Sequence, residues 1–271
     1  MCPSTIRTAA AAAAGTGLGA LGVLGGLAAG PAPAADAASS ATSATTAQAE
    51  YNAAIKAVGT KGVHFASTAL QNGVHLTVVG DTGTTSGAQT LVVKNGSSTE
   101  HMNALVVGST GYVNGNAAAL HHVIGLTSSQ SSKYAGKWLS FPASNSSLGE
   151  LVSGLLDSQV ATELQMSGPF TYDKATTVQS QHVLAVRGSV ATENGDKVPV
   201  LLYVPATGAP LPVEEVTNPG SGGGKSSIHG TVTFSKWGES VSQKAPAHSV
   251  SLLKIVPSSA GGSTTTAPAG G

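Results

Sequence analysis

The sequence predicts an α+β fold in which helices pack on one side of an antiparallel sheet. Asn-Gly pairs at 72–73, 95–96 and 194–195 separate runs of alternating apolar residues, and this pair is favoured in β-hairpin turns. One helical block around 116–166 interrupts the strand runs, without the strand–helix alternation of a parallel sheet. The chain has 13 Lys+Arg against 13 Asp+Glu and is 41% hydrophobic, a composition that argues against intrinsic disorder.

Strands account for most of the expected structure. Residues 63–115 are expected to form an antiparallel meander, and further strands are expected after the helical block. Within 228–235 the even-numbered residues are apolar or Gly and the odd-numbered ones are polar, which indicates one buried and one solvated face. The expected strands are 63–70, 74–79, 89–94, 100–107, a short strand at 111–115, one within 134–141, 183–192, 198–204, one around 214–215 and 228–235.

Three helices are expected, each from apolar residues at helical spacing. Tyr51, Ala54, Ile55 and Val58 form one stripe of a helix over 47–58. A second helix over 116–126 starts at Asn116, a favourable N-cap residue. The leucine-rich segment 147–166 is expected to be a third helix, although Gly154 weakens its helical propensity.

The N-terminus is expected to be a secretory signal peptide over residues 1–34. Arg7 is the only charge before Asp36, and the intervening segment is rich in Ala, Gly and Leu and ends in two A-x-A cleavage patterns. An uncleaved membrane anchor is the alternative for this apolar run. Small polar residues dominate 35–46 and 257–271, so we expect a flexible linker and a disordered tail around one domain at 47–256.

The residue pattern supports neither nucleic-acid nor nucleotide binding. The chain has two arginines, Arg7 and Arg187, and its lysines are scattered singly, so no basic face for phosphates is expected. Gly224-Lys225-Ser226 resembles a phosphate loop, but Pro219 occupies the position of its first glycine. A strand rather than a helix is expected after it, so 219–226 is interpreted as a hairpin loop.

No pattern points to an enzyme, a metal or a cofactor. The sequence lacks H-x-x-x-H spacing and a G-x-S-x-G elbow, and its single cysteine, Cys2, cannot form an internal disulfide. His64, His75 and His229 fall on the polar faces of expected strands, where a solvated histidine is the simplest interpretation. Glu214 and Glu215 are neighbours on a strand and should point to opposite faces, whereas acid–base pairs must converge.

Two aromatic-bearing segments and the leucine-rich segment together resemble the actinobacterial LppX/LprG-type lipoproteins, a branch of the LolA-like carriers. The matching residues are Gly108, Tyr112 and Val113, then Tyr134, Gly136, Lys137 and Trp138, then the stretch from Leu148 to Leu164. The resemblance covers 47–256, and its diagnostic part is about 105–165. Members of the family usually carry a lipid-modified cysteine after the signal, whereas Cys2 precedes the apolar run.

The resemblance implies a half-open antiparallel barrel whose concave face is covered by helices, with an apolar cavity between them for acyl chains. It also implies a non-catalytic lipid or glycolipid carrier of the cell envelope, secreted or envelope-associated, monomeric, with transient membrane contact. A structural or protein-interaction module with a closed core is the alternative. Leu105 and Val107, or their alternation partners, are expected to face the helices. The expected cavity residues are Leu105, Val107, Tyr112, Leu120, Trp138, Leu151, Leu155, Leu156 and Val160.

Overall fold

The computed structural model describes residues 34–71, 73–145, 148–191, 195, 197–218 and 229–255, with side chains from residue 46 onward. The expected signal peptide, apart from Ala34, and the expected tail at 257–271 lie outside these ranges. So does the segment 219–228, which contains the expected hairpin loop at 219–226.

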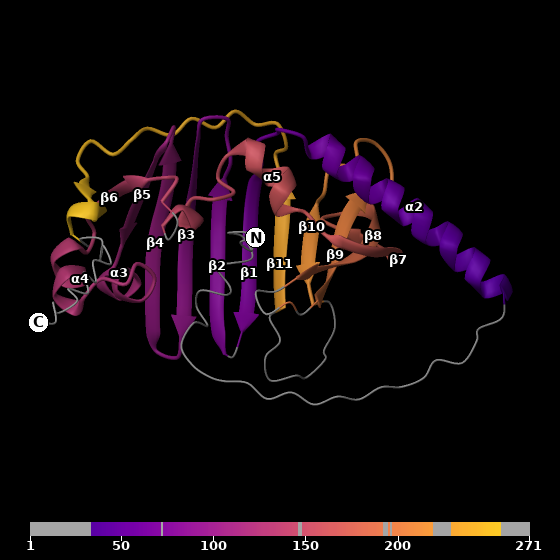
Figure 1. Cartoon of the computed structure of the whole chain (residues 1–271), viewed down its shortest axis with the longest axis horizontal. Coiled ribbons are helices and arrows are strands. Elements are labelled where there is room, and N and C mark those ends of the chain that lie inside the picture. The colour runs from indigo at the N-terminus through magenta and orange to yellow at the C-terminus, as the bar shows by residue number, and fades with distance from the viewer. Residues whose placement is uncertain are drawn as a thin grey trace, which may run out of the picture.

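Twelve strands form a single sheet, and every neighbouring pair except β12–β6 is antiparallel (Figure 1). The spatial order is β12-β6-β5-β4-β3-β2-β1-β11-β10-β9-β8-β7, so two meanders meet where β1 pairs with β11. The strands are β1 His64–Gln71, β2 Val74–Asp81, β3 Ser86–Asn95, β4 Ser98–Val107, β5 Thr110–Gly115, β6 Leu139–Pro142, β7 Ser167–Val178, β8 Gln181–Ala191, β9 Lys197–Pro205, β10 Glu214–Thr217, β11 His229–Ser235 and β12 Val250–Ser251. The expected meander over 63–115 is confirmed.

The turns of the meanders differ in how closely they follow the Asn-Gly pairs. Gln71 pairs with Val74, so two residues separate β1 from β2, as predicted. Asn95 pairs with Ser98, so the next turn is Gly96-Ser97, one residue later than predicted. Ala191 pairs with Lys197, so five residues rather than an Asn-Gly pair separate β8 from β9.

Four α-helices and two 3₁₀ turns are described, and they are shorter or longer than predicted. They are α2 Ala34–Val58, α3 Ala117–His122, α4 Ser128–Tyr134, η1 Gly149–Leu151, α5 Asp157–Glu163 and η2 Leu252–Lys254. Helix α2 includes residues 35–46, so the expected linker is helical. The single helix expected over 147–166 is wrong. Gly154 has a positive φ of 76°, and Leu156 is extended, so the segment breaks into η1 and α5.

Two strands were not predicted from the sequence, and both lie at the edges of the sheet. Strand β7 is mostly exposed or half-buried along its length, so it lacks the apolar alternation that identifies a strand. Strand β12 has only two residues and pairs with β6 in parallel. An edge strand pairs with one neighbour only, and these two strands bury few side chains, which leaves little hydrophobic pattern to detect.

The helices and the β6–β7 connection lie on one face of the sheet. Helices α3 and α4 lie near the β4–β6 end, α5 lies over the middle, and α2 crosses β7 and β8 at the other end (Figure 1). Tyr51 of α2 stacks on Phe170 of β7 with 4.5 Å between the ring centroids. Its hydroxyl accepts a hydrogen bond from the Met166 N–H and donates one to the Leu164 carbonyl. One continuous core therefore lies between the sheet and this cover.

Candidate functional site

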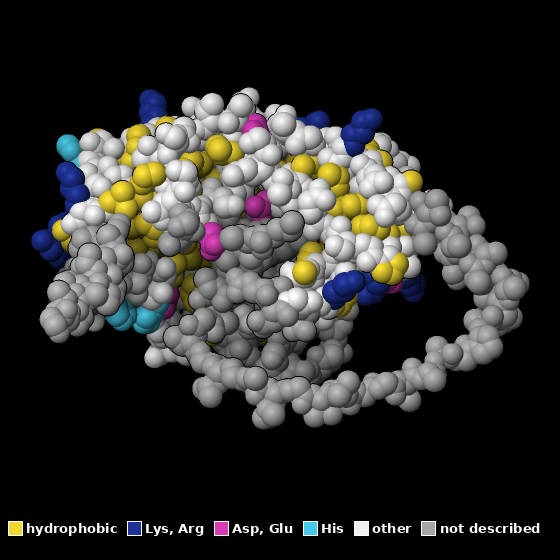
Figure 2. Space-filling view, in the orientation of Figure 1, with side chains coloured by type: hydrophobic (Ala, Val, Ile, Leu, Met, Phe, Trp, Pro, Cys, Tyr) yellow, Lys and Arg dark blue, Asp and Glu magenta, His cyan; other side chains and the backbone are white. Residues whose placement is uncertain are grey.

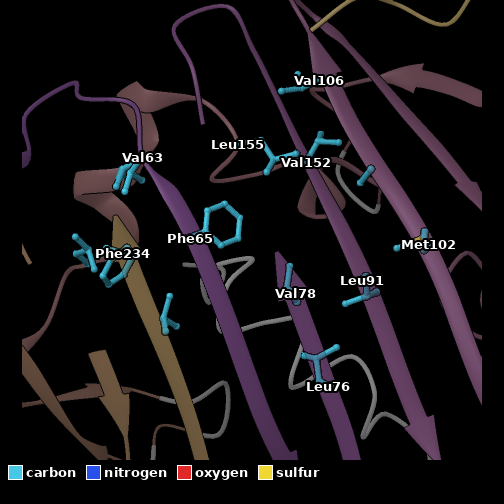
Figure 3. Close-up of a cluster of buried hydrophobic side chains, with 14 of the residues drawn as sticks. Val63, Phe65, Leu76, Val78, Leu91, Met102, Val106, Val152, Leu155 and Phe234 are labelled. Carbon is cyan, nitrogen blue, oxygen red and sulfur yellow. The ribbon is translucent and has the colours of Figure 1, made fainter. Parts of the chain in front are cut away.

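The main candidate site is the set of apolar side chains between the sheet and its cover, which we call the apolar layer. Alternation along each strand sends every second side chain to this face. The strand residues of the layer in Figure 3 are Phe65, Leu76, Val78, Leu91, Met102, Val106 and Phe234. None of these side chains is more than 6% exposed, so the layer is continuous and dry across β11, β1, β2, β3 and β4.

The β6–β7 connection completes the layer from above. Val152 and Leu155 point from it toward the strand side chains (Figure 3), and Val160 of α5 is 2% exposed. Leu155 and Leu156 run beside the segment between β2 and β3, where Gly83 forms a bridge with Leu156. The connection therefore covers the middle of the sheet, and we call its residues 148–163 the lid.

Hydrogen bonds beside β3 hold this lid to the sheet. The Asp157 N–H donates to the Gly83 carbonyl (3.0 Å), and the Thr84 hydroxyl donates to the Asp157 carboxylate (2.9 Å). The Gln89 amide on β3 donates to the Leu151 carbonyl (2.9 Å). These contacts lie beside β3 and the segment before it, and the buried side chains of Val152 and Leu155 add apolar packing.

Helix α3 closes the layer toward β4 and β5. The Asn116 side chain accepts from the Ala119 N–H (2.9 Å) and donates to the Thr99 carbonyl (2.9 Å), so one residue caps the helix and ties it to β4. Leu120 is fully buried beneath the helix. The His122 ring lies 2.6 Å from the Glu100 carboxylate at the margin of the layer. Figure 2 shows hydrophobic side chains at the surface between the α3–α4 pair and α5.

The structure brings five of the nine predicted cavity residues to this layer. Leu120, Leu155 and Val160 belong to the buried cluster, and Leu151 and Leu156 are partly buried against it. These five come from α3 and from the lid. Four of the five come from the leucine-rich segment.

Leu105, Val107 and Tyr112 are corrections, because they lie on the opposite face of the sheet. Leu105 pairs with Tyr112, and cross-strand partners share a face. The alternation partners of Leu105 and Val107, which are Ala104 and Val106, face the lid instead and belong to the buried cluster. Trp138 is half-buried in the turn before β6 and is outside that cluster. Alternation gives two sets of residues but does not say which set the helices cover.

The opposite face of the sheet carries a polar cluster across β7–β10. Arg187 forms an ion pair with Asp173. The Lys174 N–H and then Arg187 lower the pKa of Asp173 below its ordinary value. Burial raises the pKa of Glu214, and burial together with the nearby Glu214 carboxylate raises the pKa of Tyr203. Glu215 lies on the other face of β10 and is buried, so the expected divergence of the two glutamates is confirmed.

A separate open hollow of about 680 Å³ lies at the ends of β1, β2, β10 and β11. Its lining includes Thr68, Leu70, His75, Asn218 and His229, and contains none of the predicted cavity residues. The lining mixes hydroxyl, amide and imidazole groups with Leu70 and Val216. It therefore differs in chemistry from the apolar layer.

One group of side chains among the described residues could hold a metal ion. One ligand atom from each of His64, Asp81 and Glu239 lies within 4.8 Å of the other two. The strand pattern predicts a solvated histidine at His64 and does not predict this group. The hairpin turn at 72–73 contains part of the signal, because it places His64 directly opposite Asp81.

The sequence matches no protein-family model and no curated protein. Among solved structures, the chain is similar to LprF from Mycobacterium bovis, with 17% identity over 75% of this chain and 98% of that chain, at a TM-score of 0.47. It is also similar to the lipoprotein LppX of Mycobacterium tuberculosis, with 15% identity over 73% of this chain and 98% of that chain, at a TM-score of 0.43. A LolA superfamily protein from Nitrosomonas europaea matches at 8% identity over 74% of this chain and 94% of that chain, at a TM-score of 0.26. All three similarities are of fold.

Within the described ranges, no helix combines the length and the apolar character needed to cross a membrane.

Proposed function

We propose that this chain is a non-catalytic lipid carrier of the cell envelope, which holds the acyl chains of a lipid or glycolipid between its sheet and the lid. The apolar layer is the observation that carries the proposal. It spans five neighbouring strands and is lined by Phe, Leu, Val and Met side chains. Such a surface gains roughly 0.8 kcal/mol for each CH₂ group that it takes out of water.

The construction of the lid supports the same proposal. A rigid core would be expected under long helices, whereas this cover consists of η1, the short helix α5 and irregular backbone. Its hydrogen bonds beside β3 join Asp157 to Gly83 and Thr84, and Leu151 to Gln89. Separation of the lid from the sheet would open the layer while both meanders keep their strand pairing. Apolar ligand sites of this kind need few polar anchors.

A basic corner beside the layer supports contact with a membrane during loading or release. We define the basic corner by Lys133 and Lys137, whose ammonium groups lie 5.3 and 5.6 Å from the Tyr134 ring centroid, and by Leu253 and Lys254. Leu253 is 45% exposed. The segments that build the corner, 128–142 and 250–255, contain no Asp or Glu. Each lysine near an anionic bilayer contributes about 1 kcal/mol of attraction.

The first experiment is organic extraction of the purified mature chain, followed by mass spectrometry and by titration with a fluorescent fatty acid. A carrier yields co-purified lipid or takes up the probe. In a carrier, Leu155→Trp should occupy part of the acyl site and abolish probe uptake, while the melting temperature stays nearly unchanged. Val79→Trp is the matched control, because Val79 is 41% exposed and lies on the opposite face of β2.

A structural module with a closed core is the second candidate, and the near-complete burial of the apolar layer favours it. In a closed core, Leu155→Trp would overpack and lower the free energy of unfolding by about 1–3 kcal/mol. Extraction would then yield no lipid, and neither the wild-type chain nor the Val79→Trp control would take up the probe. That combination of results would remove the carrier proposal.

Membrane contact is tested separately by co-sedimentation with vesicles. Vesicles containing anionic phosphatidylglycerol should bind the chain more strongly than vesicles of phosphatidylcholine alone, and added salt should weaken the binding. Replacing Lys133, Lys137 and Lys254 together by Gln should remove the preference for anionic lipid. Lys94→Gln, at the exposed end of β3, is the control. Equal binding of the triple variant would exclude the basic corner as the contact surface.

A further inference from the structure

Three side chains from separate parts of the chain converge at the junction of the two meanders. His64 is the first residue of β1, and Asp81, the last residue of β2, lies directly opposite it in the ladder. Glu239 follows β11 in the turn that starts at Lys236. Their ligand atoms lie within 4.8 Å of one another, and the His64 Nδ1 atom lies 2.6 Å from an Asp81 carboxylate oxygen.

Backbone contacts hold the turn that carries Glu239 against the start of β1. The Gly238 N–H donates to the Gly62 carbonyl (2.7 Å), and the Glu239 N–H donates to the Lys236 carbonyl (3.1 Å). A Cβ atom at position 62 would lie 2.7 Å from the Glu239 carbonyl oxygen, so this close approach requires a glycine there. The fold therefore fixes the position of Glu239, although this residue lies in a turn.

Glu239 has an oxygen atom whose hydrogen-bonding capacity is unused. Its Oε1 atom is buried and has no hydrogen-bond partner, and its Oε2 atom lies 3.9 Å from the Lys236 ammonium group. A buried carboxylate oxygen without a donor is unfavourable, because it has lost water without gaining a replacement. A cation at this position would supply the missing partner.

We infer that His64, Asp81 and Glu239 bind a divalent transition-metal ion, of which Zn²⁺ is the representative. One imidazole and two carboxylates form a ligand set that suits such ions. Zinc binds these groups at about 2.0–2.2 Å, so small side-chain rotations would bring all three donors onto one ion. The two carboxylates carry two negative charges against the single charge of Lys236. The side chains of His64, Asp81 and Glu239 are 29%, 36% and 24% exposed, which leaves a path for the ion and a position for water or a further ligand.

The ion would also link the β1–β2 hairpin to a segment that is distant in the sequence. It would join β1, β2 and the segment after β11, where the two meanders pair. A ligand that binds only the folded chain stabilises it in proportion to its concentration relative to Kd. Zinc should therefore raise the melting temperature of the full chain.

The test is isothermal titration calorimetry of the chelator-treated, tag-free chain with ZnCl₂. The expected result is a site with a stoichiometry of one and a zinc-dependent rise in melting temperature. Glu239→Gln and His64→Ala should each weaken zinc binding at least tenfold and remove the thermal shift, while their circular dichroism stays like the wild type. Lys236→Gln should tighten binding, because it removes the cation nearest to the site.

His75→Ala is the matched control, since His75 lies at the far end of the same hairpin and opposite Leu70. It should leave the zinc affinity unchanged. Absence of zinc binding by the wild-type chain, or binding that survives both Glu239→Gln and His64→Ala, would overturn the inference. Either result would leave His64 and Asp81 as a hydrogen-bonded pair beside Glu239.

Discussion

At the residue scale, the packing of Phe65 depends on the lack of a side chain at Gly80 on the neighbouring strand. The two residues are paired in the β1–β2 ladder. A Cβ atom at position 80 would lie 2.6 Å from the Phe65 ring and 2.6 Å from the Ala88 carbonyl oxygen. The ring therefore occupies space that any other residue would fill, which keeps the apolar layer closely packed at its centre.

Gly80→Ala should lower the free energy of unfolding by about 1–3 kcal/mol, the usual range for overpacking. Gly230→Ala is the control on the same face, because its new Cβ would meet only ordinary contacts at 3.6 Å and beyond. Urea denaturation of both variants measures the difference. If Gly80→Ala were as stable as Gly230→Ala, the Phe65 ring would not depend on this glycine.

Burial of Glu214 makes a pH-dependent contribution to stability. Burial raises the pKa of this carboxyl group above its ordinary value, so the folded chain binds its proton more tightly than the unfolded chain does. The resulting destabilisation is absent below the unfolded pKa of about 4.3 and is complete once the pH exceeds the folded pKa. Glu214→Gln should therefore stabilise the chain at pH 7 relative to the wild type, and the difference should vanish near pH 3.5. Thermal melts across this range test the sign.

At the element scale, the lid depends on side chains from β3. Gln89 and Thr90 are consecutive residues on opposite faces of this strand. The Gln89 amide donates to the Leu151 carbonyl of the lid, whereas the Thr90 hydroxyl donates to Asn103 on the exposed face. Variants of these two residues therefore test one contact with the lid and one contact within the sheet.

Gln89→Leu should speed hydrogen exchange across 148–163, because it removes a donor to the lid, and should leave β1–β5 protected. Thr90→Val should leave exchange in the lid unchanged. Mass spectrometry of peptic fragments measures both variants. A faster exchange that extended through β1–β5 would show that the lid and the sheet open together, which would contradict a separately moving lid.

The sequence pattern predicts the elements whose signals are local and misses those that depend on distant partners. The turn at 72–73 sets the β1–β2 register, because residues whose numbers sum to 145 lie opposite each other. The apolar spacing of 147–166 satisfies a helix. The backbone breaks at Gly154 instead, and Val152, Leu155 and Val160 all remain buried. Burial of leucines against a sheet does not require a continuous helix, so periodicity alone could not decide.

At the scale of the whole molecule, the candidate site also combines features that local sequence predicts with features that depend on distant partners. The leucine-rich segment could be assigned to the cover of the sheet, because its many apolar side chains need a surface to pack against. The face of β4 could not be assigned, because Leu105 and Val106 are both apolar and both buried. His64 and Asp81 meet through the β1–β2 hairpin, but Glu239 reaches them only through the β1–β11 pairing, which joins residues more than 150 positions apart.

The two meanders form one continuous sheet, so they should unfold together. The chain contains two tryptophans, Trp138 before β6 and Trp237 after β11, where Trp237 packs against Phe234. The single-tryptophan variants Trp138→Phe and Trp237→Phe each report on one region by fluorescence. Their urea transitions should coincide after correction for any difference in stability measured by circular dichroism. Two separated transitions within one variant would show that the meanders are independent units.

The position of β1 imposes an order of assembly on the sheet. Strand β1 is the first of the described strands in the sequence, yet it lies in the interior of the sheet, and its second neighbour, β11, is the last but one. Until residues 229–235 are synthesised, one side of β1 carries unpaired N–H and C=O groups. An unpaired strand edge next to apolar side chains can pair with another nascent chain. Chains truncated before β11 should therefore aggregate, because one edge of β1 stays unpaired.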